Sequence, residues 1–202
     1  VEVRPAKTIY LTMKLLILLL VTSFFAAGQA TCAADNNDPD GVREHLAWKS
    51  CNPNDVIQPI SITVTDPAGN NNYPIDVSKA LLITAKSVNN GITYNKLLID
   101  VDIYAWNKGL FAKTCTWNVV PTFHLLYNLD GCSIGKNCPL LPGPLTLEVS
   151  VDLSPYKAIL QILLGNTPYK LHMRILNGDD SQHEEIMCLD VEAMIAKGSS
   201  SA

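Results

Sequence analysis

Apolar and polar residues alternate along most of the chain from Val56 onward. The clearest case is the segment 145–153, in which leucine and valine occupy every second position and Thr, Glu, Ser and Asp stand between them. Such a period of two is typical of a strand with one buried and one solvated face. The alternation recurs in residues 60–65, 97–105, 171–175 and 187–195.

Turn-forming residues separate these segments. Clusters rich in Asn, Asp, Gly and Pro occur at 66–72, 89–91, 107–109, 142–144 and 177–181. Strands with one wet face favour antiparallel sheets over a buried parallel sheet. About six or seven such strands with almost no helix predict an all-β fold, a β-sandwich of two antiparallel sheets.

One segment has helical rather than strand periodicity. Ser154 can cap a short helix that begins at Pro155 and ends at Gly165. The apolar stripe of this helix would either pack on the core or flank the mouth of a cavity. The apolar residues at helical spacing are Tyr156, Ile159, Leu160 and Leu163.

The N-terminal residues have the pattern of a secretory signal peptide. Lys14 precedes the apolar stretch 15–27, which is too short for an ordinary membrane span. We expect Met13 to start the signal, with cleavage after Ala30 or, as the rival site, after Ala34. The predicted organisation is upstream residues and signal over 1–30, a flexible leader over 31–45, one domain over 46–196 and a disordered tail over 197–202.

The mature chain is expected to be acidic. Cleavage after residue 30 leaves 12 basic and 18 acidic residues, a net charge of −6. Nucleic-acid binding needs a concentrated Lys/Arg surface, which this balance does not provide. No Asn-x-Ser/Thr acceptor occurs, which disfavours sugar-directed sorting to lysosomes. We expect a secreted, extracellular monomer rather than a protein of the lysosomal lumen, with no nucleic-acid partner.

Cys132 and Cys138 form the most closely spaced cysteine pair, with five residues between them. Such a pair closes a small disulfide loop or supplies half of a metal site. A zinc site of four ligands needs a second pair at short spacing, but Cys51, Cys115 and Cys188 stand alone. The spacing therefore favours a disulfide, as export would allow, and predicts no metal site.

No pattern of catalytic residues accompanies the four histidines, which are His45, His124, His172 and His183. Neither a Gly-x-Ser-x-Gly elbow nor a His-Glu-x-x-His pair occurs. The acidic residues over 179–185 follow Asn177 and Gly178, which favours a solvated hairpin turn over a cation site. We expect no enzymatic activity and no cofactor.

Several short motifs occur in a fixed order: Trp48 before Cys51, a strand over 60–64, Asp-Gly-Cys at 130–132 with Cys-Pro-Leu at 138–140, and Cys188 in the last strand. Their order and the strand pattern resemble the ML family of secreted lipid-recognition domains over about residues 46–195. The resemblance implies an immunoglobulin-like sandwich with an internal lipid cavity. It also implies the pairs Cys51–Cys188 and Cys132–Cys138. Cys115 would either pair with Cys32 or remain free.

The resemblance makes the inward residues of the strands candidates for lining the lipid cavity. A buried methylene contributes about 0.8 kcal/mol, so only a nearly continuous apolar lining retains a lipid. The alternative for each residue is an ordinary core position. The candidates are Ile62, Val64, Ile99, Val101, Ile103, Leu147, Val149, Val151, Leu171, Met173 and Ile175, with Leu160 and Leu163 of the predicted helix.

Large apolar residues also gather in and beside the stretch between Cys115 and Cys132, which we predict to be irregular because Pro121 and Thr122 argue against a strand. This stretch would either meet lipid or membrane at the rim of the entrance, or fold down as a plug over the core. The rim candidates are Phe111, Trp117 and Phe123, with Leu125 and Leu126.

The functional hypothesis is a secreted lipid-binding or lipid-transfer protein that holds a hydrophobic ligand between two β-sheets and contacts membranes transiently. Sterol, fatty acid, phospholipid and glycolipid all fit apolar walls, so the sequence does not choose among them. The competing hypothesis is a secreted receptor-docking or immune-modulating sandwich module without lipid carriage.

Overall fold

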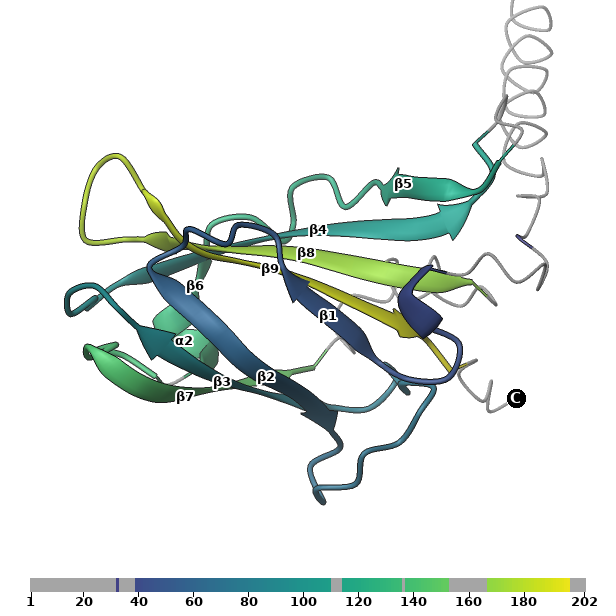
Figure 1. The fold of residues 1–202 in the computed structure, drawn as a ribbon, viewed down its shortest axis with the longest axis horizontal. Helices are drawn as coiled ribbons and strands as arrows, with labels where there is room; N and C mark the ends of the chain where they lie inside the picture. The colour runs from purple at the N-terminus through teal and green to yellow at the C-terminus, as the bar shows by residue number, and fades with distance from the viewer. Residues whose placement is uncertain (1–31, 33–38, 110–113, 136, 153–166, 197–202) are drawn as a thin grey trace, which may run out of the picture. The chain divides into compact units, whose positions relative to one another are not determined.

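The computed structural model describes residues 32, 39–109, 114–135, 137–152 and 167–196, which form two facing antiparallel β-sheets (Figure 1). The predicted all-β sandwich is confirmed. The larger sheet has the order β1 (Ala47–Ser50), β9 (Glu185–Met194), β8 (Pro168–Asn177), β4 (Leu97–Asn107) and β5 (Thr116–Val120), and β6 (Leu129–Asp130) also pairs with β4. The smaller sheet has the order β2 (Ile57–Thr65), β3 (Leu81–Asn89) and β7 (Gly143–Val151).

The strands β4, β8 and β9 set the two faces of the larger sheet. Val101 lies opposite Met173 of β8, which lies opposite Leu189 of β9. Because side chains alternate across a strand, the apolar residues of this parity all point to one face, where they pack with residues of the smaller sheet. Asp100 and Asp190 lie at the opposite parity. The alternation in the sequence thus becomes an apolar inner face and a polar outer face.

β3 is a strand that the alternation does not predict. Its outward positions include Leu82 and Val88 beside polar residues, so the contrast between the two faces is weak. It forms a strand because it is the middle of the smaller sheet, bonded to β2 on one side and β7 on the other. Tertiary pairing here overrides a weak local pattern.

The stretch between Cys115 and Cys132 contains β5 and β6, so the prediction that it is irregular is wrong for these residues. β5 ends at Val120, directly before Pro121, which has no N–H to continue the ladder. Proline thus ends the strand without preventing it. The helix predicted from Ser154 to Gly165 lies outside the described residues.

A one-turn helix, α2 (Gly131–Gly135), follows β6. The Asp130 carboxylate caps it, because Oδ1 accepts hydrogen bonds from the backbone N–H of Cys132 at 3.0 Å and of Ser133 at 3.2 Å. The Ser133 hydroxyl and these backbone groups hold the pKa of Asp130 below its usual value. A Cβ at Gly131 would lie 2.9 Å from Cβ of Leu97, so close packing against β4 requires glycine there.

Three disulfides crosslink the domain. Cys51–Cys188 joins the loop after β1 to β9, and Cys132–Cys138 closes the loop around α2, as the family resemblance implied. The third bridge joins Cys32 to Cys115, which decides between the two states left open for Cys115. The Cα–Cα separations are 5.3, 5.3 and 6.2 Å, in the order given.

Val42, in the segment predicted as a flexible leader, is fully buried. A short 3₁₀ turn, Pro39–Gly41, precedes it. The Tyr73 hydroxyl donates a hydrogen bond to the Val42 carbonyl and accepts one from the backbone N–H of Met194 at 2.7 Å. Tyr73 therefore ties the residues before β1 to the end of β9.

We expect the Cys51–Cys188 bridge to stabilise the fold more than the Cys132–Cys138 bridge. Its loop contains far more residues, and the chain-entropy estimate gives about 5 kcal/mol for the long loop and about half that for the short one. Replacing both cysteines of one pair by serine and measuring urea unfolding should reveal this order. Equal losses of unfolding free energy for the two double variants would contradict it.

Candidate functional site

The inner face of the larger sheet is incompletely covered at its centre. Ile99 and Ile103 of β4 are buried, but Val101 between them is partly exposed. Leu171 and Met173 of β8 are partly exposed as well. Both strands have neighbours on each side in the sheet, and their inner faces point to the other sheet. In a tightly packed sandwich the inward residues of central strands are normally buried, so the partial exposure of these three residues is unusual.

The smaller sheet repeats this pattern. Ala85 of β3 and its partner Leu147 of β7 are buried, whereas the next inward pair, Ile83 and Val149, is partly exposed. The following pair, Leu81 and Val151, is partly exposed too. On β2, Ile62 and Val64 are buried. The inward side chains of β3 and β7 are therefore less buried with increasing distance from the end of the sheet near α2.

Three clusters of buried apolar residues account for this difference. The largest contains residues of both sheets, including Ile62, Leu147, Ile99 and Ile175. A second cluster joins Val64 of β2 to Ala193 of β9 and so closes one side of the sandwich. The third includes no residue of the smaller sheet among the described residues; its members are Ile103, Ala105, Val120, Leu126 and Tyr169. Among the described residues, buried clusters therefore connect the two sheets near α2, whereas the buried cluster beside β5 draws on the larger sheet and the loop after β5.

The structure brings eleven of the predicted lining residues together on the inner faces of β2, β4, β7 and β8. These are Ile62, Val64, Ile99, Val101, Ile103, Leu147, Val149, Val151, Leu171, Met173 and Ile175. Phe111, Leu160 and Leu163 lie outside the described residues. The structure adds inward residues that were not among the lining candidates. These are Leu81 and Ile83 on the unpredicted β3, Tyr169, and Ala105, which the alternation over 97–105 already included. Tyr169 continues the alternation of β8 and could have been found.

Trp117 is not on the inner face. It pairs with Trp106 across β4 and β5, with ring centroids 5.2 Å apart. Its ring also lies 5.2 Å from the ammonium nitrogen of Lys170, on the face that carries Asp190. The structure thus sets Trp117, a rim candidate, on the face of the sheet opposite to the residues predicted to line the cavity.

The loop after β5 has one buried anchor and two exposed apolar side chains. Leu126 is buried, and its carbonyl accepts a hydrogen bond from the backbone N–H of Val101 at 2.9 Å. Phe123 is 81% exposed and Leu125 55% exposed. Phe123 and His124 both have positive φ, 51° and 59°, which is unfavourable for residues other than glycine. The loop therefore both closes on the core and presents apolar groups to the surroundings.

Charged groups pair on the outer face of the larger sheet. Arg174 donates to the Asp100 carboxylate at 3.1 Å. His172 Nδ1 lies 2.7 Å from Oδ1 of Asp190, and Lys170 Nζ lies 3.8 Å from Oδ2. These pairs occupy three neighbouring strands, β4, β8 and β9. The attraction within each pair offsets much of the desolvation free energy that charged side chains lose on a partly covered surface.

Glu192 is the most buried acidic side chain of this outer face, with 2% of its side chain exposed. Neither carboxylate oxygen has a hydrogen-bond partner among the described residues. Burial raises the pKa of Glu192 above 4.5, its ordinary value, although Lys49 Nζ lies 3.6 Å from Oε1 and opposes the shift. The folded protein therefore holds this proton more tightly than the unfolded chain does.

The chain has the architecture of a disulfide-linked antiparallel sandwich whose apolar inner faces are partly uncovered. The family model described as an ML domain matches residues 45–195, and this chain belongs to the ML domain family. The resemblance noted in the sequence is confirmed. This family is associated with lipid recognition, and three disulfides with an ML domain are typical of extracellular proteins. Within the described part of the chain, every helix is too short or too polar to cross a membrane.

Two further comparisons add no functional information. No curated protein matches the chain significantly. Among the solved structures that match is the C-terminal domain of wzt, at 12% identity, with 78% of this chain and 81% of that chain covered and a TM-score of 0.36. A likeness of that size carries no argument about this protein.

Replacing Glu192 by Gln should stabilise the fold at neutral pH. Because the folded pKa is raised, ionisation of Glu192 lowers stability as pH rises from the unfolded pKa through the folded pKa. The variant should therefore gain unfolding free energy relative to wild type between pH 4 and pH 7 in urea titrations. Glu148→Gln on the exposed side of β7 is the matched control and should show no such trend. A Glu192→Gln variant that loses relative stability with rising pH would contradict the expectation.

Proposed function

We propose that this protein is a secreted lipid-binding and lipid-transfer protein that holds one hydrophobic ligand between its two sheets. The observation that carries the proposal is the partial exposure of Val101, Leu171 and Met173, which face inward from two central strands. Inward apolar residues at the centre of a sheet are normally fully covered, so the accessible surface that these residues retain supports a ligand there.

The energetics favour an apolar ligand at this place. Each methylene that leaves water contributes about 0.8 kcal/mol, so a chain of some 15 methylenes brings on the order of 12 kcal/mol before ordering costs. The paired charges of Arg174 and His172 lie on the outer face, where they do not contact such a ligand. Shape and apolar area, rather than ion pairs, would therefore select the ligand. A sterol, a fatty acid, a phospholipid and a glycolipid remain candidate classes.

The loop that carries Phe123 and Leu125 supplies a route for exchange. Its exposed apolar groups adjoin the cluster of β4, β5 and β8, because the Leu126 carbonyl is bonded to Val101. Inserting such groups into a bilayer interface is favourable. A transient membrane contact there would let a lipid move without crossing water.

Three disulfides and the predicted signal peptide support residence outside the cell. The ML domain and the absence of a catalytic motif support a role in binding rather than in catalysis. The alternative is that the protein docks on a receptor and carries no lipid.

The direct test is extraction of the natively secreted protein with organic solvent, followed by mass spectrometry. About one lipid per protein molecule is expected. Preparations that are empty and that also fail to bind fluorescent sterol or fluorescent fatty acid would refute lipid carriage.

Filling the uncovered region should block ligand without unfolding the protein. Val149→Trp places a large ring at a partly exposed inward position, so we expect binding of a fluorescent lipid to weaken about tenfold or more, with less than about 1 kcal/mol lost in stability. Leu147→Trp, two positions earlier on the same face, is the matched control. Leu147 is buried among both sheets, so the larger ring should cost about 1–3 kcal/mol in urea unfolding. Unchanged binding by a well-folded Val149→Trp variant would count against the site.

Removing the apolar groups of the loop should slow lipid transfer between vesicles. Burying a phenylalanine contributes about 1.5–3 kcal/mol, so Phe123→Ser should lower the transfer rate about tenfold while leaving equilibrium binding of a soluble fluorescent lipid unchanged. Ile60→Ser is the matched control, because Ile60 is 60% exposed on β2 and outside this loop. An equal effect of both substitutions would exclude a specific role for the loop.

A further inference from the structure

Two exposed apolar residues, Ile92 and Leu141 (the apolar pair), lie at the end of the sandwich where β3 ends and β4 and β7 begin. Ile92 is 66% exposed and Leu141 60% exposed. Ile92 belongs to the connection from β3 to β4, and Leu141 belongs to the connection from α2 to β7. Figure 1 shows both connections, together with the hairpin between β8 and β9, at one end of the two sheets. Neighbouring apolar groups that a fold holds in water are typical of interaction sites.

A buried side chain sets the apolar pair side by side. Asn89, 2% exposed, donates from Nδ2 to the carbonyl oxygens of Ile92 at 2.8 Å and of Leu141 at 3.2 Å. Because one amide nitrogen contacts both oxygens, the two residues are neighbours. Oδ1 of Asn89 accepts a hydrogen bond from the N–H of Gly91 at 2.9 Å, and a Cβ at Gly91 would collide with Cγ1 of Val56. Only glycine fits this turn.

Backbone pairing fixes the two connections to each other. Tyr94 and Leu140 are buried, and their backbone groups exchange hydrogen bonds of 3.1 and 2.8 Å. The Cys132–Cys138 disulfide anchors the start of the connection that carries Leu141. The backbone that presents the apolar pair is therefore held by hydrogen bonds and by a covalent crosslink.

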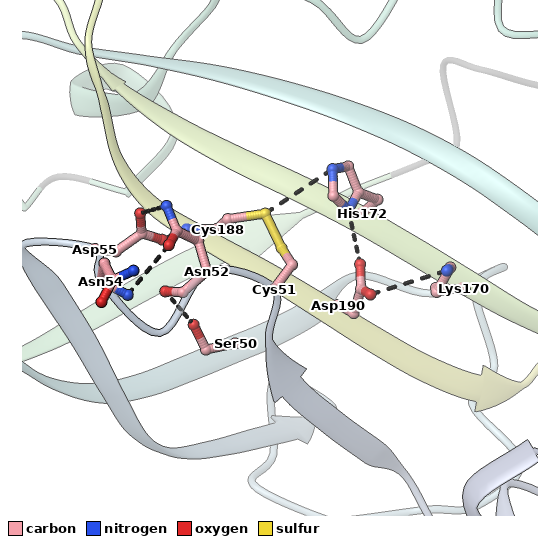
Figure 2. Close-up of a disulfide and its surroundings, with 9 residues drawn as sticks. All are labelled: Ser50, Cys51, Asn52, Asn54, Asp55, Lys170, His172, Cys188 and Asp190. Carbon is pink, nitrogen blue, oxygen red and sulfur yellow. Dashed lines mark hydrogen bonds and ion pairs between the residues drawn. A yellow bond between two sulfur atoms is a disulfide. The ribbon is translucent and has the colours of Figure 1, made fainter.

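The loop after β1 also anchors the turn between β3 and β4. The N–H of Asn90 donates to the carbonyl of Val56 at 2.9 Å. Figure 2 shows the Asp55 carboxylate of this loop beside Asn52, whose Nδ2 donates to it at 2.6 Å; the backbone N–H of Cys188 donates to its other oxygen. A partner would thus meet a surface that is already ordered, which lowers the entropic cost of association.

The hairpin between β8 and β9 is bonded to the same turn. Oδ2 of Asp179 accepts a hydrogen bond from the N–H of Asn95 at 2.6 Å. The N–H of Gly178 donates to the carbonyl of Lys96 at 2.9 Å. The hairpin therefore lies next to the connection that carries Ile92.

This end of the molecule has a negative border. The described residues of the three connections, 90–96, 137–142 and 178–184, carry three carboxylates and one lysine, namely Asp179, Asp180, Glu184 and Lys96. Burial raises the pKa of Tyr94, and the charges of Glu184 and Asp180 raise it further. The field of these carboxylates thus reaches the residues on which the apolar pair is mounted.

We propose that the apolar pair and its acidic border, together the tip surface, dock a basic protein segment in which apolar side chains lie between Lys or Arg residues. The apolar side chains of the partner would cover Ile92 and Leu141, and its cations would face the carboxylates. A second copy of this chain would bring the same carboxylates to the contact, and an anionic membrane would be repelled by them. Ala85 and Leu147 are buried toward this end, so docking leaves the proposed lipid site free.

A synthetic peptide provides the test. The secreted, oxidised protein, labelled with ¹⁵N, is titrated at low salt with the end-blocked peptide Lys-Lys-Leu-Trp-Leu-Lys-Lys. We expect saturable shifts of the amide resonances of Ile92, Leu141 and Gly178, and none at Val119 on β5. The peptide with Glu in place of each Lys should not bind.

Variants separate the apolar and the ionic contribution. The double variant Ile92→Ser/Leu141→Ser should weaken peptide binding about tenfold or more, because it removes the central contacts. Glu184→Gln should weaken binding about two- to fivefold at low salt, and added salt should abolish the difference. The matched controls are Val119→Ser, at a position 64% exposed on β5, and Glu44→Gln, at an exposed position before β1. Both should bind like the wild type.

Three results would each overturn the proposal. The first is the absence of saturable shifts at millimolar peptide, or shifts that map to another surface. The second is unchanged affinity in the Ile92→Ser/Leu141→Ser variant when its urea unfolding matches that of the wild type. The third is broadening of the tip resonances by phosphatidylcholine vesicles without any response to the basic peptide, which would assign the surface to a membrane instead.

Discussion

The antiparallel register of β4, β8 and β9 is the constraint on which the rest of the structure depends. It sets Ile103 opposite Leu171 and Leu171 opposite Val191, so that apolar side chains of three strands share one face. A slip of one residue would turn Asp100 and His172 toward the other sheet. Burying those charged groups without partners would cost several kcal/mol, so only one register is compatible with a folded sandwich. The Cys51–Cys188 disulfide then links the loop after the edge strand β1 to β9.

The same register assigns different chemistry to the two faces. The inner face offers apolar surface that the smaller sheet covers only in part, which suits a ligand without charge. The outer face holds ion pairs such as Arg174 with Asp100, and beside them the disulfide with His172.

Much of the fold follows from local patterns, because a period of two is visible wherever one face is wet. The segment 145–153 predicts β7, and eleven lining candidates do lie on inner faces. β3 could not be found in this way, since its outward positions mix apolar and polar residues. Trp117 was placed at the rim because it is large and apolar, but the pairing of β4 with β5 sets it on the outer face. The hydrophobicity of a residue alone does not predict on which face of the sheet its side chain lies.

The sequence by itself determined the class of fold and the resemblance to the family, because alternation, turn residues and the order of short motifs are local or ordinal properties of a chain; two of the disulfides followed only as what that resemblance implies. Only the tertiary structure decided the partner of Cys115, the partial exposure of Val101, Leu171 and Met173, and the meeting of Cys51, Cys188 and His172. These depend on which strands become neighbours and how closely the two sheets pack. Such distances arise from the pairing of segments remote in the chain, which no local pattern encodes.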